Sequence, residues 1–163
     1  GLINQSLGNT EETDRIFSLL DNAKKNEPNN ASLYYVEGDI YKEMKYYANA
    51  EKYFYKSAEI DPNYVYGPLS VGVMYYDQAV DIQTKASEES DDAKYNELMK
   101  EFEATLEKAV NPFEKAFSIS NDSEIKAAVA EYLKNIYFRF RSKGESYQQA
   151  YDKYNEVYNN SKK

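Results

Sequence analysis

The sequence has no cysteine, histidine or tryptophan. Without cysteine and histidine the chain cannot form a Cys/His zinc site, a thiol nucleophile or a Ser-His-Asp triad. Because the chain has no cysteine, it can form no disulfide bond that would indicate an oxidising compartment, and its compartment cannot be inferred in this way. An enzyme would have to use paired carboxylates or a lysine or tyrosine base, and the acidic residues show no spacing typical of such a site. We therefore predict a protein with no catalytic function, no cofactor and no metal site.

Positive charge and long apolar runs are also scarce. The 163 residues include 20 Lys and Arg against 28 Asp and Glu, giving a net charge of −8, which disfavours binding to nucleic acid. No apolar run approaches the ~18 residues that would span a bilayer, and no signal peptide is recognisable. Hydrophobic residues nevertheless make up 42% of the chain, and 18 residues are tyrosines. This composition predicts a folded core rich in large amphipathic side chains.

One long spacing occurs twice within the chain. Pro28 and Pro62 have the same separation as Gly38 and Gly72, about 34 residues, which is a period typical of helical repeats. A small residue allows close approach of a neighbouring helix, and proline fits the first turn of a helix. A second pattern, in steps of 4, 3 and 5, predicts buried helix faces, with Phe54 and Phe113 filling the space between helices. It occurs in three sets: Ile16, Leu20, Ala23 and Pro28; Ala50, Phe54, Ser57 and Pro62; Ala109, Phe113, Ala116 and Asn121.

These spacings resemble the tetratricopeptide repeat (TPR), a helix-turn-helix unit of about 34 residues, over nearly the whole chain. The resemblance implies an all-α fold in which antiparallel helix pairs stack as a right-handed superhelix, with the first helices lining a concave face. Glu37 departs from the family, which often has a large apolar residue before the glycine, and Tyr34 stands where tryptophan is frequent. The register of the last repeat stays open, because Asn121 and Tyr137 are farther apart than the equivalent Pro28 and Tyr41.

By comparison with the first repeat, about 25 additional residues lie within the second. They account for the much larger separation of Gly72 and Ala109 than of the equivalent Gly38 and Ala50. Apolar residues continue at helical spacing on both sides of the polar segment 87–92. We therefore predict two elongated helices that form an antiparallel hairpin projecting beyond the repeat layer.

The repeat pattern also predicts the helix boundaries. Thr10, Asn30 and Ser123 are expected N-caps, and Pro112 should kink the long helix because it removes a hydrogen bond to residue 108. We expect helices at 11–26, 31–45, 47–60, 64–86, 91–119, 124–141 and 145–159. Together they form a single TPR-like domain, residues 1–163, interpreted as a fragment of a longer chain. Its parts are a partial repeat (1–30), a repeat (31–63), a repeat with the insertion (64–122) and a terminal helix pair (123–163).

Two short segments look like the C-terminal part of exported bacterial TPR proteins that have an elongated hairpin in one repeat. They are Asn-Pro-Phe-Glu-Lys-Ala at 111–116 and Leu-Lys-Asn-Ile-Tyr at 133–137. This resemblance implies a protein of the bacterial periplasm or cell envelope.

The helix phase predicts a partner-binding concave face. Tyrosine and arginine are enriched at binding hot spots, so we hypothesise a scaffold that binds a peptide or protein segment there. The alternative for each residue is that it only packs or contacts solvent, and the alternative function is a structural or self-association module that uses the hairpin. The predicted site residues are Tyr35, Asp39, Lys42, Tyr66, Leu69, Val73, Tyr76, Asn135, Phe138 and Arg139.

Three charged features bear on the choice of partner. Asp39 would repel a carboxylate, which disfavours the grip on C-terminal carboxylates known from some TPR domains. The acidic segment 88–92 lacks the glycine and the ligand spacing of a calcium loop, so a solvated connection is favoured. The basic run from Lys134 to Lys143 either receives an acidic partner or stabilises a helix C-terminus.

Overall fold

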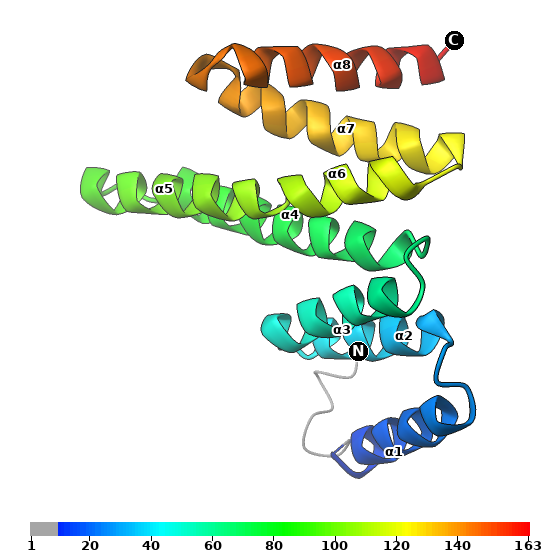
Figure 1. Ribbon diagram of the computed structural model, residues 1–163. Helices are drawn as coiled ribbons and strands as arrows, with labels where there is room; N and C mark the ends of the chain where they lie inside the picture. The colour runs from blue at the N-terminus through cyan, green and yellow to red at the C-terminus, as the bar shows by residue number, and fades with distance from the viewer. Residues whose placement is uncertain (1–9) are drawn as a thin grey trace. The chain divides into compact units, whose positions relative to one another are not determined.

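The computed structural model describes residues 10–163, and all regular structure in this range is helical (Figure 1). The all-α, helical-repeat fold is therefore confirmed. The chain divides into two compact units, the first ending at Pro68 and the second covering Leu69–Lys163. The elements are α1 (Thr10–Asn26), α2 (Ala31–Glu43), α3 (Tyr47–Ile60), α4 (Tyr66–Ser87), α5 (Asp92–Lys108), α6 (Val110–Ile119), α7 (Ser123–Phe140), the short 3-10 helix η2 (Arg141–Lys143) and α8 (Glu145–Ser161).

In the first unit, a glycine on α2 packs against a phenylalanine on α3. Phe54 is fully buried, as predicted. A Cβ atom added to Gly38 would lie 2.7 Å from Cδ1 of the Phe54 ring, which is closer than unbonded atoms approach. The absence of a side chain at this position is therefore what allows the ring to lie against the α2 backbone.

The second unit repeats this contact between α4 and α6. Phe113 is fully buried, and a Cβ atom on Gly72 would lie 2.6 Å from its Cδ1 atom. Along the chain, Phe113 lies much farther from Gly72 than Phe54 lies from Gly38. The two pairs thus make the same packing contact although their separations along the chain differ.

The prediction of one helix over residues 91–119 is wrong. The structure has two helices, and Ala109 lies between the end of α5 and the start of α6. Proline has no N–H, so Pro112 cannot donate to the carbonyl of residue 108, and regular α-helix ends at that residue. The two helices follow one another alongside α4 in Figure 1. Consistent with this path, the Lys108 ammonium lies 5.7 Å from the centre of the Tyr75 ring.

Helix caps explain several other boundaries. Asn30 caps α2, as predicted, by accepting a hydrogen bond from the N–H of Ser32 at 3.1 Å. The predicted cap Ser123 is wrong, because the Asp122 carboxylate accepts from the N–H groups of Glu124 and Ile125 and places Ser123 inside α7. Aspartate competes well for this position because its charge also favours the helix N-terminus.

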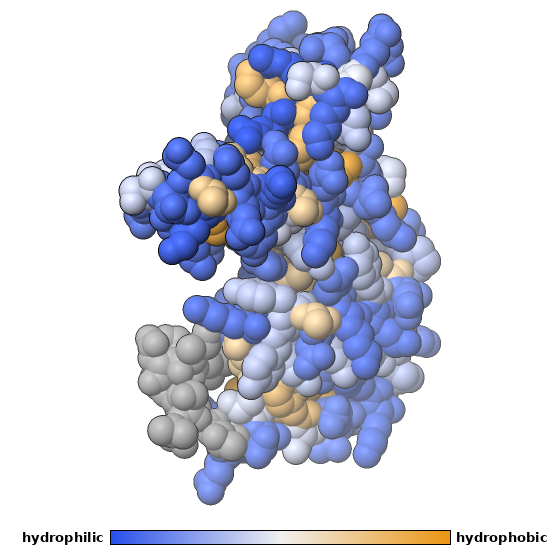
Figure 2. Space-filling model, turned by 90° about the vertical axis from the view of Figure 1, so that its left-hand side faces the viewer, coloured by the Kyte–Doolittle hydropathy of each residue, from blue (hydrophilic) through white to orange (hydrophobic). Residues whose placement is uncertain are grey.

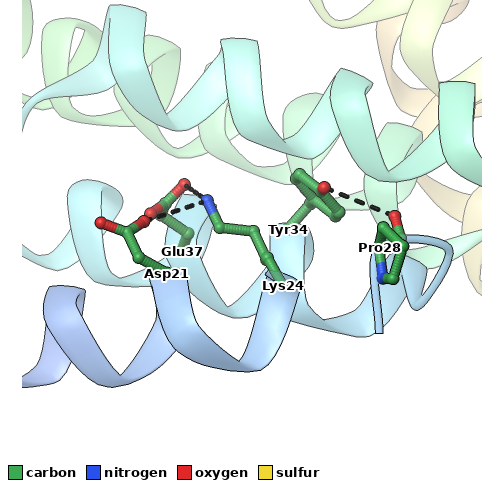
Figure 3. Close-up of polar contacts among 5 residues, drawn as sticks. All are labelled: Asp21, Lys24, Pro28, Tyr34 and Glu37. Atoms are coloured by element: carbon green, nitrogen blue, oxygen red, sulfur yellow. Dashed lines mark hydrogen bonds and ion pairs between the residues drawn. The ribbon is translucent and has the colours of Figure 1, made fainter. Parts of the chain in front are cut away.

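Glu37 is buried next to Gly38, where an apolar residue was expected. Its carboxylate accepts a hydrogen bond from the Lys24 ammonium on α1 at 3.0 Å (Figure 3). The ammonium also lies 5.1 and 5.3 Å from the ring centres of Tyr34 and Tyr53. Burying a carboxylate is unfavourable without such a partner, so Lys24 accounts for the tolerance of a charge between α1 and α2.

We predict that Phe113→Ala lowers the free energy of unfolding by roughly 3–5 kcal/mol, because a fully buried ring is lost from a site that its neighbours hold open. Phe113 also stacks on Tyr132, with 4.7 Å between ring centres. Urea titration followed by circular dichroism would measure the loss. A change below about 1 kcal/mol would mean that Phe113 is not a core residue.

A second prediction concerns the Lys24–Glu37 pair. Replacing Glu37 with Ala leaves the Lys24 charge without its buried partner and should cost about 3 kcal/mol. The double variant Lys24→Met/Glu37→Leu removes both charges and should have nearly the stability of the natural sequence. If urea titration showed that the single and the double variant are equally destabilised, the unpaired charge of Lys24 would not be the cause of the lost stability.

The same pair has a defined pH dependence. Burial alone lowers the pKa of Lys24, but the hydrogen bond and charge of Glu37 outweigh burial, so that its pKa is raised. A raised folded-state pKa stabilises the protein below the unfolded value of about 10 and ceases to do so as the pH rises through the folded value. The natural sequence should therefore lose more stability than the double variant above about pH 10.

A third prediction tests the additional residues. Replacing the segment 77–101 with a short turn brings the separation of Gly72 and Ala109 close to that of Gly38 and Ala50 and retains Gly72 and Phe113. We expect a helical protein that melts cooperatively in circular dichroism, because the main packing contact of the second unit lies outside the deleted segment. Non-cooperative melting would instead show that this segment is needed for the core.

Candidate functional site

A groove of about 450 Å³ lies within the second unit, between α4, α5, α7 and η2. Its apolar floor consists of the buried side chains of Phe102, Leu106 and Ile136. Val80 and Phe138 also line the groove, and they are 40% and 48% exposed. The groove thus combines a floor of buried apolar side chains with apolar side chains that are accessible to another molecule.

Four of the ten predicted site residues line this groove: Tyr76, Asn135, Phe138 and Arg139. Tyr76 is half-buried, and its ring packs edge-on against Tyr132 with 4.8 Å between centres. Leu69 and Val73 also belong to the second unit, on α4, but they are half-buried and do not line the groove. The structure therefore brings together predicted residues from α4 and α7.

The wall that α5 contributes to the groove was not predicted. Phe102 and Leu106 belong to the apolar residues that follow segment 87–92 at helical spacing, and Val80 is not among the predicted site residues. The apolar spacing at Phe102 and Leu106 is visible in the sequence, but the spacing within one helix does not show which other helix it faces.

The remaining predicted residues belong to the first unit. Tyr35 and Tyr66 form an aromatic cluster with Tyr64, in which ring centres lie 5.7 to 6.3 Å apart. Tyr66 is the most exposed of the three, since Tyr35 and Tyr64 are half-buried. Asp39 and Lys42 pair with each other at 3.4 Å on successive turns of α2, so their charges largely compensate one another.

Basic residues at one end of the groove are held by acidic and aromatic neighbours. Arg139 on α7 pairs with Glu103 at 3.3 Å, and Lys143 in η2 pairs with Glu107 at 3.3 Å. Glu103 and Glu107 lie one helical turn apart, so the two pairs link successive turns of α5 with the end of α7. The basic run predicted from the sequence thus contributes two exposed ion pairs between α5 and the end of α7.

A tyrosine–glutamate cluster in the second unit has the groups of a possible acid–base site. The Glu114 carboxylate accepts hydrogen bonds from the hydroxyl groups of Tyr137 and Tyr154. Burial, together with the hydrogen bonds and charge of Glu114, raises the pKa of both tyrosines far above the usual value of 10. Both phenols therefore stay protonated at neutral pH, and the cluster joins α6, α7 and α8 rather than supplying a base.

The acidic connection between α4 and α5 has a local structural role. The Asp91 side chain caps α5 by accepting a hydrogen bond from the N–H of Lys94 at 2.9 Å, and Glu89 accepts one from the N–H of Asp91 at 3.0 Å. Across residues 10–163, no three acidic side chains are grouped as a bound metal ion would require. No helix in the same range has the length and apolarity needed to cross a membrane.

Comparison with known proteins gives one match. A family model for the tetratricopeptide repeat matches residues 31–64, the segment that contains α2, α3 and the Gly38–Phe54 contact. No curated protein and no solved structure matches the sequence. Residues 31–64 thus match a tetratricopeptide repeat, and they lie within a structure whose regular elements are all helical over residues 10–163.

Proposed function

We propose that this protein is a protein-interaction scaffold without catalytic activity, and that the groove of the second unit binds a segment of another protein. The observation that carries this proposal is the exposed pair Phe138 and Val80 above the buried floor formed by Phe102, Leu106 and Ile136. Binding a partner there would cover apolar surface that the folded chain leaves in contact with water.

The residue types around the groove also favour a protein partner. Tyr76, Phe138 and Arg139 belong to the types enriched at binding hot spots, and they lie around a recessed apolar floor. Tetratricopeptide repeats generally mediate contacts between proteins, and repeat folds of this kind present extended surfaces for binding. The tyrosine cluster of the first unit, with Tyr66 exposed, is proposed as a separate contact area on the same class of partner.

The absence of catalytic activity is proposed from the chemistry of the side chains. The acidic residues nearest the groove, Glu103 and Glu107, are engaged with Arg139 and Lys143. Tyr137 and Tyr154 are held protonated by their surroundings. The raised pKa values of the two tyrosines leave neither phenol able to act as a base near neutral pH.

The alternative of self-association through the long helices is supported less well. Figure 2 shows one face of the molecule, on which hydrophobic residues form separate patches among hydrophilic ones. Obligate interfaces between copies are usually larger and more continuously apolar. A groove with a small apolar floor fits a single inserted segment better than a second folded copy.

Site-specific photocrosslinking would test the proposal. The protein would carry p-benzoylphenylalanine in place of Phe138 and would be irradiated in an extract of its native cells. Tyr95 on α5 provides a matched control position, because it is 41% exposed and does not line the groove. We expect the groove position to form an adduct with a different protein, and the control position to form none or much less.

Two outcomes would contradict the proposal. Equal adduct formation at both positions would show that the groove has no preference for a partner. An adduct between two copies of this chain would support the self-association alternative instead.

A further inference from the structure

The cations beside the groove differ in whether they already have a carboxylate partner. Arg139 pairs with Glu103 and Lys143 pairs with Glu107, each at 3.3 Å. Arg141, which also lines the groove and is exposed, has no ion pair with any residue in the described range. One positive charge therefore remains available at this edge of the groove.

Arg141 is also held in an orientation suited to recognition. Its guanidinium carbon lies 3.6 Å from the centre of the Phe138 ring, so the side chain covers an exposed aromatic residue. A contact of this kind leaves N–H donors at the edge of the guanidinium group free to bind. A carboxylate matches these donors because it can accept two parallel hydrogen bonds from arginine.

The floor of the groove sets a second requirement for the partner. Phe102, Leu106 and Ile136 offer no side-chain hydrogen bond, so a polar group inserted among them would lose its contact with water without compensation. A bulky aliphatic or aromatic side chain would instead bury its surface there. Arg141 and this floor belong to the same groove, so a single short segment can meet both requirements.

We propose that the groove recognises an acidic amphipathic segment, whose carboxylate pairs with Arg141 while a neighbouring bulky apolar side chain enters the floor. This inference rests on the proposed function and specifies the chemistry of its partner. The net charge of −8 repels acidic molecules from most of the surface, so the exposed Arg141 also selects where and in which orientation such a segment binds.

A designed peptide probe would test the proposal on the full chain. The probe is a fluorescent peptide of about 16 residues, long enough for four helical turns. It has leucine at positions 3, 6, 7 and 10, glutamate at most other positions, and blocked termini that carry no charge. A second peptide has glutamine in place of every glutamate. Fluorescence anisotropy at two salt concentrations would give both affinities. We expect the glutamate peptide to bind at least tenfold more tightly, with a smaller difference at high salt.

Variants of the protein distinguish the contribution of the Arg141 charge to peptide binding from that of the apolar groove. Arg141→Gln should weaken binding of the glutamate peptide at least tenfold and leave binding of the glutamine peptide unchanged. Arg15→Gln is the matched control, because it removes the same charge from an exposed position on α1, and it should have no effect. Val80→Ser tests the apolar wall without altering Arg141 and should weaken both peptides.

The outcomes distinguish this inference from the proposed function. Suppose that Val80→Ser weakens binding, that Arg141→Gln does not, and that the glutamine peptide binds as tightly as the glutamate peptide. The groove then binds a segment, but the proposed preference for acidic segments is wrong. If Val80→Ser has no effect on a peptide that binds, the groove is not the site and the proposed function fails with it. Absence of binding by both peptides overturns the acidic specificity, and photocrosslinking then decides the function. Equal, Arg141-dependent binding of a single-stranded oligonucleotide would overturn the choice of a protein partner.

Discussion

The contact between a glycine and a phenylalanine fixes the arrangement of helices within each unit. In the second unit it begins a continuous chain of aromatic contacts, because Phe113 lies against Gly72 and stacks on Tyr132, which in turn packs edge-on against Tyr76. Tyr76 follows Gly72 by one helical turn and therefore lies on the same side of α4. The contact between Gly72 and Phe113 is thereby connected to the position of Tyr76 at the groove. A larger residue at position 72 would displace both Phe113 and Tyr76.

Most of the groove in the second unit is built from residues outside the contact between Gly72 and Phe113. α4 continues past Gly72 to Ser87, and α5 follows it along the chain before α6 supplies Phe113. Val80 comes from the part of α4 after Gly72, while Phe102 and Leu106 come from α5. The core contact of the first unit requires no such helices. The glycine–phenylalanine contact and the groove are therefore made by different residues of the second unit.

The sequence predicted those features that depend on spacing along one helix or on the repeat period. The period identified Gly38 and Gly72, and the shorter pattern identified Phe54 and Phe113. Contacts between distant residues could not be predicted, because Glu103 and Arg139 are 36 residues apart and their pairing depends on how α5 and α7 meet. Glu37 illustrates the same limit. Its departure from the family pattern is compensated by Lys24, which lies on another helix. Nothing in the spacing along the chain connects the two residues, so the pair could not be predicted.

The ion pairs that position α5 also define the chemistry left available at the groove. Glu103 and Glu107 come from α5, and by approaching Arg139 and Lys143 they compensate two of the cations near the end of α7. Arg141 contacts the face of Phe138 instead and so keeps its charge accessible. Without α5 beside α7, Arg139 and Lys143 would lack these carboxylate partners and would be uncompensated like Arg141. The same two carboxylates therefore link α5 to the end of α7 and leave Arg141 as the exposed cation of the groove that has no ion pair within residues 10–163.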